Sequence, residues 1–396
     1  MARRGRRAVG AFFGANGFVM GAWAPQIPLL LPRHMITESI LGLLILGLGL
    51  GAVAAMLFSA RLIIAFGSRR VATGFGLAAV PMLPLIILAP SVWTLALLMA
   101  AMGAMVGSMD VAMNSNAVMV ERRLGRPIMS SSHGFWSLGG FFGGSLGSIA
   151  IAHFGALAQS LMTAGIALVL ILWGMGKLVA DEAVHTELKP PGQPKEKFPL
   201  LPRDLALWIL GFLAMASMIP EGAVLDWAAL YLSLDLGSGL LNAGMAYAFF
   251  SGAMAIMRFV GDAVRYRFGA VNTLRASGVI GAVGLMLAAL APTEHFAVAG
   301  FAMSGLGVAN MVPILFSAAG NHPGLPSGQA ISTVTMVGYG GILLAPATIG
   351  YVAEHLGFRL TYAALAILLV LVAGLAGRAA AADNLRKSAP VQGQTV

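Results

Sequence analysis

Long, almost uninterrupted apolar runs make up most of the chain, and their residues do not alternate between apolar and polar types. Strands of a membrane β-barrel require such alternation, so the pattern excludes a barrel. A helix needs about 20 apolar residues to cross a hydrocarbon core of ~30 Å. Charge clusters and Pro or Gly breaks cut the chain into segments of that length. We therefore predict an all-α integral membrane protein with twelve transmembrane helices at residues 8–31, 39–62, 70–90, 92–119, 130–152, 157–178, 204–233, 240–263, 271–291, 296–319, 328–353 and 358–378.

One long polar stretch, residues 179–203, separates the first six spans from the last six. Its Pro, Gly, Lys and Glu content is typical of a solvated linker. We therefore predict a six-helix bundle over residues 1–178, a cytoplasmic linker over 179–203, a second six-helix bundle over 204–378 and a cytoplasmic tail over 379–396.

The two halves also share sequence at one fixed offset. GSIAIAHFG (147–155) is similar to IGYVAEHLG (349–357), and Gly67 and Gly139 correspond to Gly269 and Gly341 at the same distance of 202 residues. A repeated match at one offset indicates internal duplication. Two parallel six-helix halves, with a substrate site between them near the membrane midplane, form a known transporter architecture.

The positive charges are distributed unequally between the two sides of the predicted bundle. Of the 24 Lys and Arg residues, 21 fall on the side where the chain starts. Arg33 and Arg359 fall on the opposite side, and Arg258 lies inside the eighth span. The positive-inside rule therefore predicts that both termini are cytoplasmic. The apolar stretch after the basic N-terminus lacks a cleavage site, and we interpret it as a retained first helix.

Composition narrows the functional classes. Only 10% of the residues are charged, against roughly 25% in soluble domains, so the net charge of +9 indicates membrane topology rather than nucleic-acid binding. There is no cysteine, no Walker motif and no clustering of the seven histidines. We therefore expect no cofactor, no metal site and no ATP hydrolysis.

The twelve spans, the central linker and two Gly-Arg loops, after the second and eighth spans, resemble the major facilitator superfamily over nearly the whole chain. Ile64 and Tyr266 stand where the loop signature of that family has Asp. The resemblance implies a gating role for these loops and their neighbours, namely Gly67, Arg69, Arg70, Arg258, Asp262, Arg267 and Gly269.

Three further segments, at residues 15–28, 110–140 and 220–232, resemble the YbjJ-type branch of bacterial permeases, which is distantly similar to fucose permeases. This resemblance implies transport of a small solute across the bacterial inner membrane. It does not define the solute.

Three acidic residues lie inside predicted spans, where an ionisable side chain is a functional candidate. We expect Asp110, Glu221 and Asp226 to be the proton-coupling candidates, since burial favours a neutral carboxyl group and a nearby arginine favours a charged one. Alternatively, Asp110 forms a structural pair with Arg258 or with a loop arginine, and Asp226 is an interface anchor. For Arg258 itself we expect a side chain that extends toward the cytoplasmic face and reaches Asp262 one turn later.

Other polar and aromatic residues within the spans are candidates for the substrate cavity, although Asn side chains also join helices by ordinary hydrogen bonds. Trp rings could stack on a sugar or occupy the aromatic belts of the membrane. The cavity candidates are Asn16, Trp23, Asn114, Trp136, Trp227, Tyr247, Asn310, Thr335 and Tyr339.

These expectations describe a secondary active transporter rather than an enzyme. The leading hypothesis is a proton-coupled symporter of a sugar-like or other polar metabolite that works by alternating access. The alternatives are an efflux carrier that exchanges protons for amphipathic compounds and a non-transporting membrane sensor or scaffold. The expected partners are the small-molecule substrate, the proton and the lipid bilayer, with no nucleic acid, and we expect a monomer.

Overall fold

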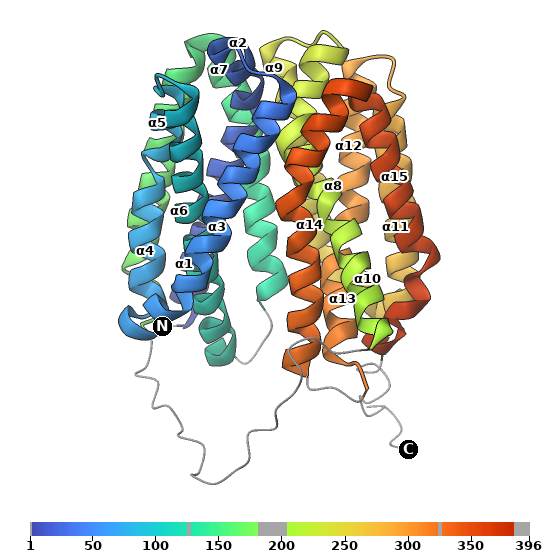
Figure 1. The fold of residues 1–396 in the computed structure, drawn as a ribbon. Coiled ribbons are helices and arrows are strands. Elements are labelled where there is room, and N and C mark those ends of the chain that lie inside the picture. Colours follow the sequence, from blue (N-terminus) through green and yellow to red (C-terminus); the bar gives the residue numbers. More distant parts are fainter. Residues whose placement is uncertain (1, 125–127, 181–203, 324–326, 384–396) are drawn as a thin grey trace, which may run out of the picture.

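The computed structural model describes residues 2–124, 128–180, 204–323 and 327–383, and every regular element in these ranges is helical (Figure 1). The first half of the molecule comprises α1 to α7, and the second half comprises α8 to η2. The helices are α1 (Ala2–Trp23), η1 (Ala24–Gln26), α2 (Ile27–His34), α3 (Glu38–Phe66), α4 (Ser68–Ala79), α5 (Met82–Ile87), α6 (Val92–Leu124), α7 (Met129–Met175), α8 (Leu205–Asp235), α9 (Leu240–Ala243), α10 (Met245–Phe268), α11 (Ala270–Ala289), α12 (Glu294–Val308), α13 (Met311–Gly320), α14 (Ser327–Leu356), α15 (Phe358–Gly374) and η2 (Ala376–Asp383).

All twelve predicted spans coincide with these helices. Eight described helical segments are by themselves long and apolar enough to cross a membrane, or nine when α15 and η2, bent by 49°, count as one. The 47-residue α7 contains two predicted spans because Gly155, with φ 83° and ψ 170°, turns the chain within it. α1 and the shorter apolar helix at Met245–Gly261, within α10, supply the remaining passes.

Two boundaries differ from the predicted ones. The first span breaks at Trp23, where Pro25 leads into the 3-10 turn η1, because Pro cannot donate a backbone hydrogen bond. The predicted tail from residue 379 is helical through Asp383, whose carboxylate accepts hydrogen bonds from the first backbone N–H groups of α11. The predicted linker lies outside the described residues from 181 onward.

Four glycines form sharp corners with nearly identical backbone angles. Gly67 and Gly269 join α3 to α4 and α10 to α11, with φ of 83° and 82°. Gly155 and Gly357 turn the chain at the opposite end of the bundle, again with φ of 83° and 82°. Only glycine adopts this conformation without strain. Both pairs have the offset of 202 residues, so the predicted internal repeat is confirmed in backbone conformation.

The repeat extends to helix packing. A side chain on Gly103 would collide with the backbone oxygen of Leu48, and one on Gly305 would collide with that of Phe250. These two contacts, between α6 and α3 and between α12 and α10, also lie 202 residues apart. Lipid supplies no hydrophobic force between helices, so such close backbone contacts contribute strongly to their association.

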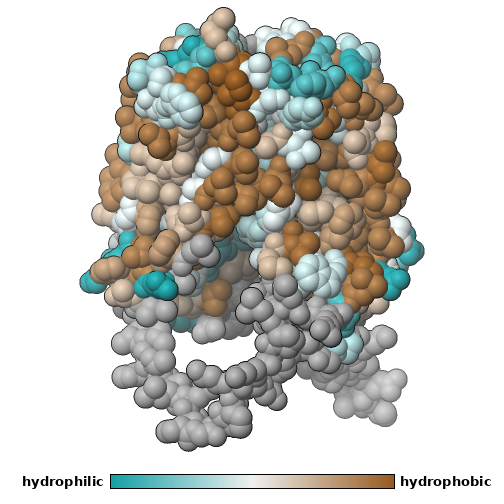
Figure 2. Space-filling model, in the orientation of Figure 1, coloured by the Kyte–Doolittle hydropathy of each residue, from teal (hydrophilic) through white to brown (hydrophobic). Residues whose placement is uncertain are grey.

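The outer surface is suited to lipid. Side chains such as Trp93, Val169 and Phe296 are 83%, 66% and 63% exposed. Figure 2 shows apolar residues over most of the visible face and hydrophilic ones mainly near its upper and lower ends. We call the end at which α4 and α11 begin, with Arg69, Arg70 and Arg267, the basic end, and the end at which α3 and α15 begin the far end.

Candidate functional site

An ion pair joins two helices of the second half beside the first half. Arg258 of α10 lies 3.2 Å from Glu221 of α8 through its Nη2, and its Nη1 donates a 2.7 Å hydrogen bond to Ser137 of α7. The two charged side chains are only 14% and 27% exposed. The main-chain oxygen of Arg258 accepts a further hydrogen bond from Ser130 of α7. The guanidinium therefore lies at the seam, the surface along which the two halves meet.

The guanidinium of Arg258 binds Glu221 and Ser137, and the predicted contact with Asp262 lies outside the described residues. A half-buried guanidinium loses hydration, and a carboxylate within reach compensates for this loss with charge-assisted hydrogen bonds. Glu221 offers that carboxylate, with both oxygens within 3.4 Å of Nη2. The side chain of Asp262 lies outside the described part of the chain.

Asp110 faces the same region from the first half. It is half-buried on α6, forms no ion pair within the described residues and is therefore not the partner of Arg258. One turn later, Asn114 donates a 2.9 Å hydrogen bond to the Asp110 main-chain oxygen. Tyr339 of α14 lies within electrostatic range of both Asp110 and Glu221. Its side chain is 41% exposed. These residues bring acidic, basic and hydroxyl groups of both halves together.

A second carboxylate lies on α8 closer to the far end. Asp226 is only 9% exposed, lies beside the indole of Trp23 and forms no ion pair within the described residues. Trp23 Nε1 and the Tyr247 hydroxyl, both buried, also lack hydrogen-bond partners there. The structure thus places the Asp226 carboxylate beside Trp23 and near Tyr247, so that buried polar groups of α1, α8 and α10 lie together.

Two of the three tryptophans proposed for stacking on a ligand, Trp23 and Trp227, are fully buried, whereas Trp136 is half-buried. The ring of Trp227 packs on Phe358 with 6.0 Å between centroids, and its atom Cη2 lies close to Gly350 of α14. Trp23 is equally inaccessible. In this conformation both rings seal the far end of the seam.

Three other cavity candidates form hydrogen bonds between helices. Asn16 of α1 accepts a 2.9 Å hydrogen bond from the indole of Trp136 on α7 and donates one of 3.2 Å to the Val106 oxygen on α6. Asn310 donates to the Met257 oxygen and packs against Gly261. These residues fix the packing of each half.

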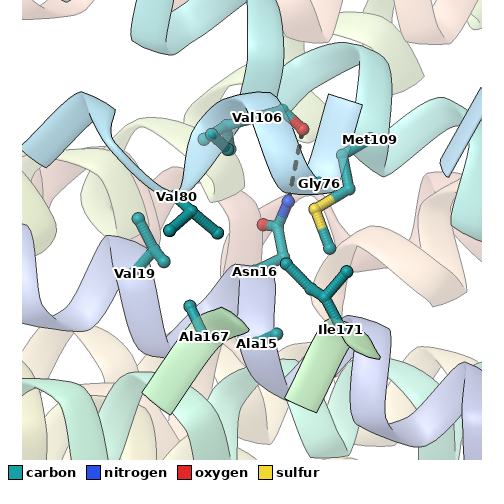
Figure 3. A pocket seen from close by; sticks show the side chains of 10 residues that line it. Ala15, Asn16, Val19, Gly76, Val80, Val106, Met109, Ala167 and Ile171 are labelled. Carbon is teal, nitrogen blue, oxygen red and sulfur yellow. Dashed lines mark hydrogen bonds between the residues drawn. The ribbon is translucent and has the colours of Figure 1, made fainter. Parts of the chain in front are cut away.

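Asn16 also borders a small cavity between α1, α4, α6 and α7 (Figure 3). The other lining residues are apolar, and both polar atoms of Asn16 already have partners. A bound water needs about two to four polar groups, and the space holds about one water molecule at most. This cavity lies inside the first half and does not suit a polar solute.

The remaining predicted site residues lie apart from this group or at its edge. Thr335 is half-buried on α14, one turn before Tyr339. Arg69 donates to the Met175 oxygen, and the guanidinium of Arg267 lies over the ring of Phe268. Gly67 and Gly269 form the corners described above, and Arg70 is exposed at the start of α4.

The seam is closed at the far end. A side chain on Gly42 of α3 would collide with the Pro346 oxygen of α14, and the Ser39 backbone N–H donates a 2.9 Å hydrogen bond to Glu354. Toward the basic end, Phe58 of α3 and Tyr339 of α14 are 58% and 41% exposed. Figure 1 shows α3 and α14 approaching one another toward the far end.

Sequence reasoning did not identify several polar residues with structural roles. Ser137 contacts Arg258, and its main-chain oxygen accepts a hydrogen bond from Ser251 across the seam. Gln26 and Gln159, fully buried, bond to one another beside the η1 turn. Glutamine inside an apolar span was a usable signal. The Ser residues, however, lie in Gly/Ser-rich runs that are equally typical of close helix packing.

Comparison with known proteins identifies the family. The model of the Major Facilitator Superfamily matches residues 9–326. An uncharacterized MFS-type transporter of Yersinia pestis is 36% identical over 368 residues, which cover 92% of this chain and 93% of the relative. An uncharacterized transporter of Sinorhizobium fredii is 34% identical, with 93% and 97% covered.

Solved structures of the same fold agree with this result. A variant of the nucleoside transporter NupG superposes with a TM-score of 0.75 at 13% identity and covers 94% of this chain and 99% of its own. A D-xylose–proton symporter gives a TM-score of 0.69 at 13% identity, with 94% and 95% covered. The predicted all-α membrane fold is therefore confirmed, and the relatives are transporters rather than enzymes. The chain belongs to the Major Facilitator Superfamily of multi-pass membrane transporters.

Proposed function

We propose that the protein moves a small polar solute across the membrane by alternating access and couples this movement to protons as a symporter. The observation that carries the proposal is the Arg258–Glu221 pair, which contacts Ser137 of the other half at the seam. A solute bound here can contact both halves, so its binding energy can favour a rearrangement of one half against the other.

The chemistry of these groups favours a solute rich in hydroxyl groups, such as a sugar or a related metabolite. Glu221 and Asp110 can accept hydrogen bonds from hydroxyls, whereas Arg258 and Ser137 can donate to them. Tyr339 can donate or accept, and its exposed ring offers an apolar face. This combination of donors and acceptors around an aromatic surface supports the predicted sugar-like class.

Among the three acidic candidates, we assign the coupling proton to Asp226. Glu221 is already neutralised by Arg258. Asp226 is nearly buried and has no cation beside it, so an ionised carboxylate there would be costly. Tyr247 and Tyr362 lie near Asp226, whereas Arg258, the cation near Tyr247, is paired with Glu221. We therefore infer that Asp226 carries a proton while the far end is closed and releases it where water reaches it.

Transport in proteoliposomes tests these assignments. A panel of sugars, sugar derivatives and amphipathic dyes is offered with and without a pH gradient across the membrane. Asp226→Asn should keep solute exchange at equal concentrations but lose accumulation driven by the pH gradient. Glu294→Gln, a carboxylate-to-amide change on α12 at a side chain that accepts a hydrogen bond from Asn242, is the matched control and should remain coupled.

Several outcomes would contradict the proposal. Coupling to protons is wrong if Asp226→Asn, Glu221→Gln and Asp110→Asn all transport normally and remain driven by the gradient. Export of the dyes alone would indicate an efflux carrier, and transport of nothing in a broad panel would favour a sensor or scaffold.

We also propose that the protein lies in the bacterial inner membrane with its basic end and both termini in the cytoplasm. The support is the excess of Lys and Arg at the basic end, because loops rich in these residues stay on the cytoplasmic side of the membrane. Because the chain has no cysteine, a single Cys placed near Arg70 or near Glu354 gives a clean label. A membrane-impermeant maleimide added outside spheroplasts should label only the second position.

One chain supplies both sides of the candidate site, which supports a monomer as the working unit. Light scattering of the purified protein, corrected for bound detergent, should give the mass of one chain of 40.8 kDa. A mass of two chains would contradict this part of the proposal.

A further inference from the structure

A groove with a volume of about 360 Å³ lies on the surface of the first half between α3 and α4. Leu62 and Phe66 line it from α3, Gly74 and Phe75 from α4, and Met105 from α6. α3 and α4 both pack on α6 and make fewer contacts with one another than with α6. Since α6 packs in turn on α1 and α7, the groove opens away from the interior of the bundle, toward the membrane.

One charged residue borders this apolar groove. Arg70 lies in the first turn of α4, is exposed and has no hydrogen bond or ion pair within the described residues. The neighbouring Arg69, by contrast, bonds to the Met175 oxygen. The α4 lining continues from Arg70 to Ala78, which corresponds to about 12 Å along a helix. The groove therefore begins with a cation at the basic end and continues into the hydrocarbon region.

We propose that this groove binds an anionic phospholipid, with an acyl chain between α3 and α4 and the phosphate group beside Arg70. The apolar walls match an acyl chain, and the unpaired guanidinium matches a phosphate, which arginine can bind in a bidentate manner. The cation lies at the end of the spans, at the depth expected for headgroups. Phosphatidylglycerol satisfies these requirements, whereas phosphatidylcholine adds a positive charge near Arg70.

Arg70→Gln tests the headgroup contact. The purified full chain is titrated with fluorescent phosphatidylglycerol and with phosphatidylcholine that carries the same acyl chains. The wild type should prefer phosphatidylglycerol, and Arg70→Gln should weaken its binding about fivefold, the effect of one basic residue near a headgroup. Phosphatidylcholine binding should not change. Arg61→Gln, an exposed arginine of α3 that does not line the groove, is the control.

Gly74→Trp tests the acyl-chain contact. Gly74 is exposed, and no atom lies within 4 Å of the place where a Cβ would stand, so a Trp can occupy the groove without displacing its walls. Binding of both lipids should fall at least tenfold. Gly165→Trp is the matched control, because Gly165 is likewise exposed and unobstructed but lies on α7 outside the groove.

Equal binding of the two phospholipids by the wild type, or unchanged phosphatidylglycerol binding by Gly74→Trp, overturns the proposal. A monodisperse gel-filtration profile checks the fold of each variant, and the two substitutions act on different parts of the lipid. If the wild type carries the fluorescent phosphatidylglycerol across the bilayer, the groove belongs to a transport substrate, and the proposal of a resident lipid fails.

Discussion

Arg258 illustrates what can be predicted at the scale of one residue. Its position as the one cation well inside a span was evident from the sequence, but its partner was not. Helical spacing indicates neighbours three or four positions away, whereas Glu221 lies 37 residues earlier on another helix. The Ser137 contact, 121 residues away, depends on how the two halves meet. Such contacts depend on tertiary packing, which one sequence without an alignment does not reveal.

The ion pair leads to a prediction about stability. Glu221→Gln leaves the guanidinium of Arg258 partly buried without a counter-ion and should lower the free energy of unfolding by roughly 1–3 kcal/mol, less than for a fully buried pair. Adding Arg258→Gln to this variant should recover part of the loss, because it removes the uncompensated charge. Thermal unfolding in detergent measures both effects. Additive losses in the double variant would contradict a direct interaction between the two side chains.

At the scale of elements, most of the fold could be predicted. Continuous apolar runs, charge clusters and the fixed offset of 202 residues indicated twelve helices in two related halves. The breaks within helices were harder to foresee. Gly155 lies between two predicted spans, so a break there was evident from the spacing, but a single sharp corner at this glycine was not. The 3-10 turn after Trp23 depends on Pro25 together with the buried glutamines beside it.

The glycine corners lead to a prediction about stability in which backbone strain is the only expected cause. Gly155 and Gly357 have no neighbour within 4 Å of a side-chain position, but their positive φ suits only glycine. Gly155→Ala and Gly357→Ala should each lower the free energy of unfolding by about 1–3 kcal/mol. Gly165→Ala, in regular helix and equally unobstructed, should instead raise it by up to about 1 kcal/mol. Unfolding temperatures of the three variants test the contrast, and a gain for either corner variant would refute it.

At the scale of the whole molecule, the residues of the seam could not be predicted from the pattern of apolar and polar residues. Hydrophobic periodicity indicates which segments are helical, but an inter-half surface built from Gly42, Pro346 and Gly350 has the same composition as helix packing elsewhere in the chain. The closed far end and the exposed residues toward the basic end are therefore findings of the structure.

Blocking the closure gives the third prediction. A side chain on Gly350 would lie 2.6 Å from the Glu38 oxygen and 2.8 Å from the Trp227 ring, so Gly350→Trp should prevent the far end from closing. Transport should be lost, while a Cys introduced at Ser39 should become reactive toward maleimide. Gly340→Trp, at an unobstructed site on the same helix, should leave that Cys protected. Protection in both variants would show that the closed seam does not depend on Gly350.

The pairing of α1 with α7 has a consequence for biosynthesis. Asn16 shares a hydrogen bond with Trp136, a partner that is translated 120 residues later. At roughly 5–20 residues per second, the first helix waits about 6–24 s in the membrane before that partner emerges from the ribosome. During this interval its glycine-rich face and its amide have only lipid, the translocon or other proteins as neighbours. Membrane chaperones and quality-control proteases can therefore best recognise this exposed face while the first half is still being synthesised.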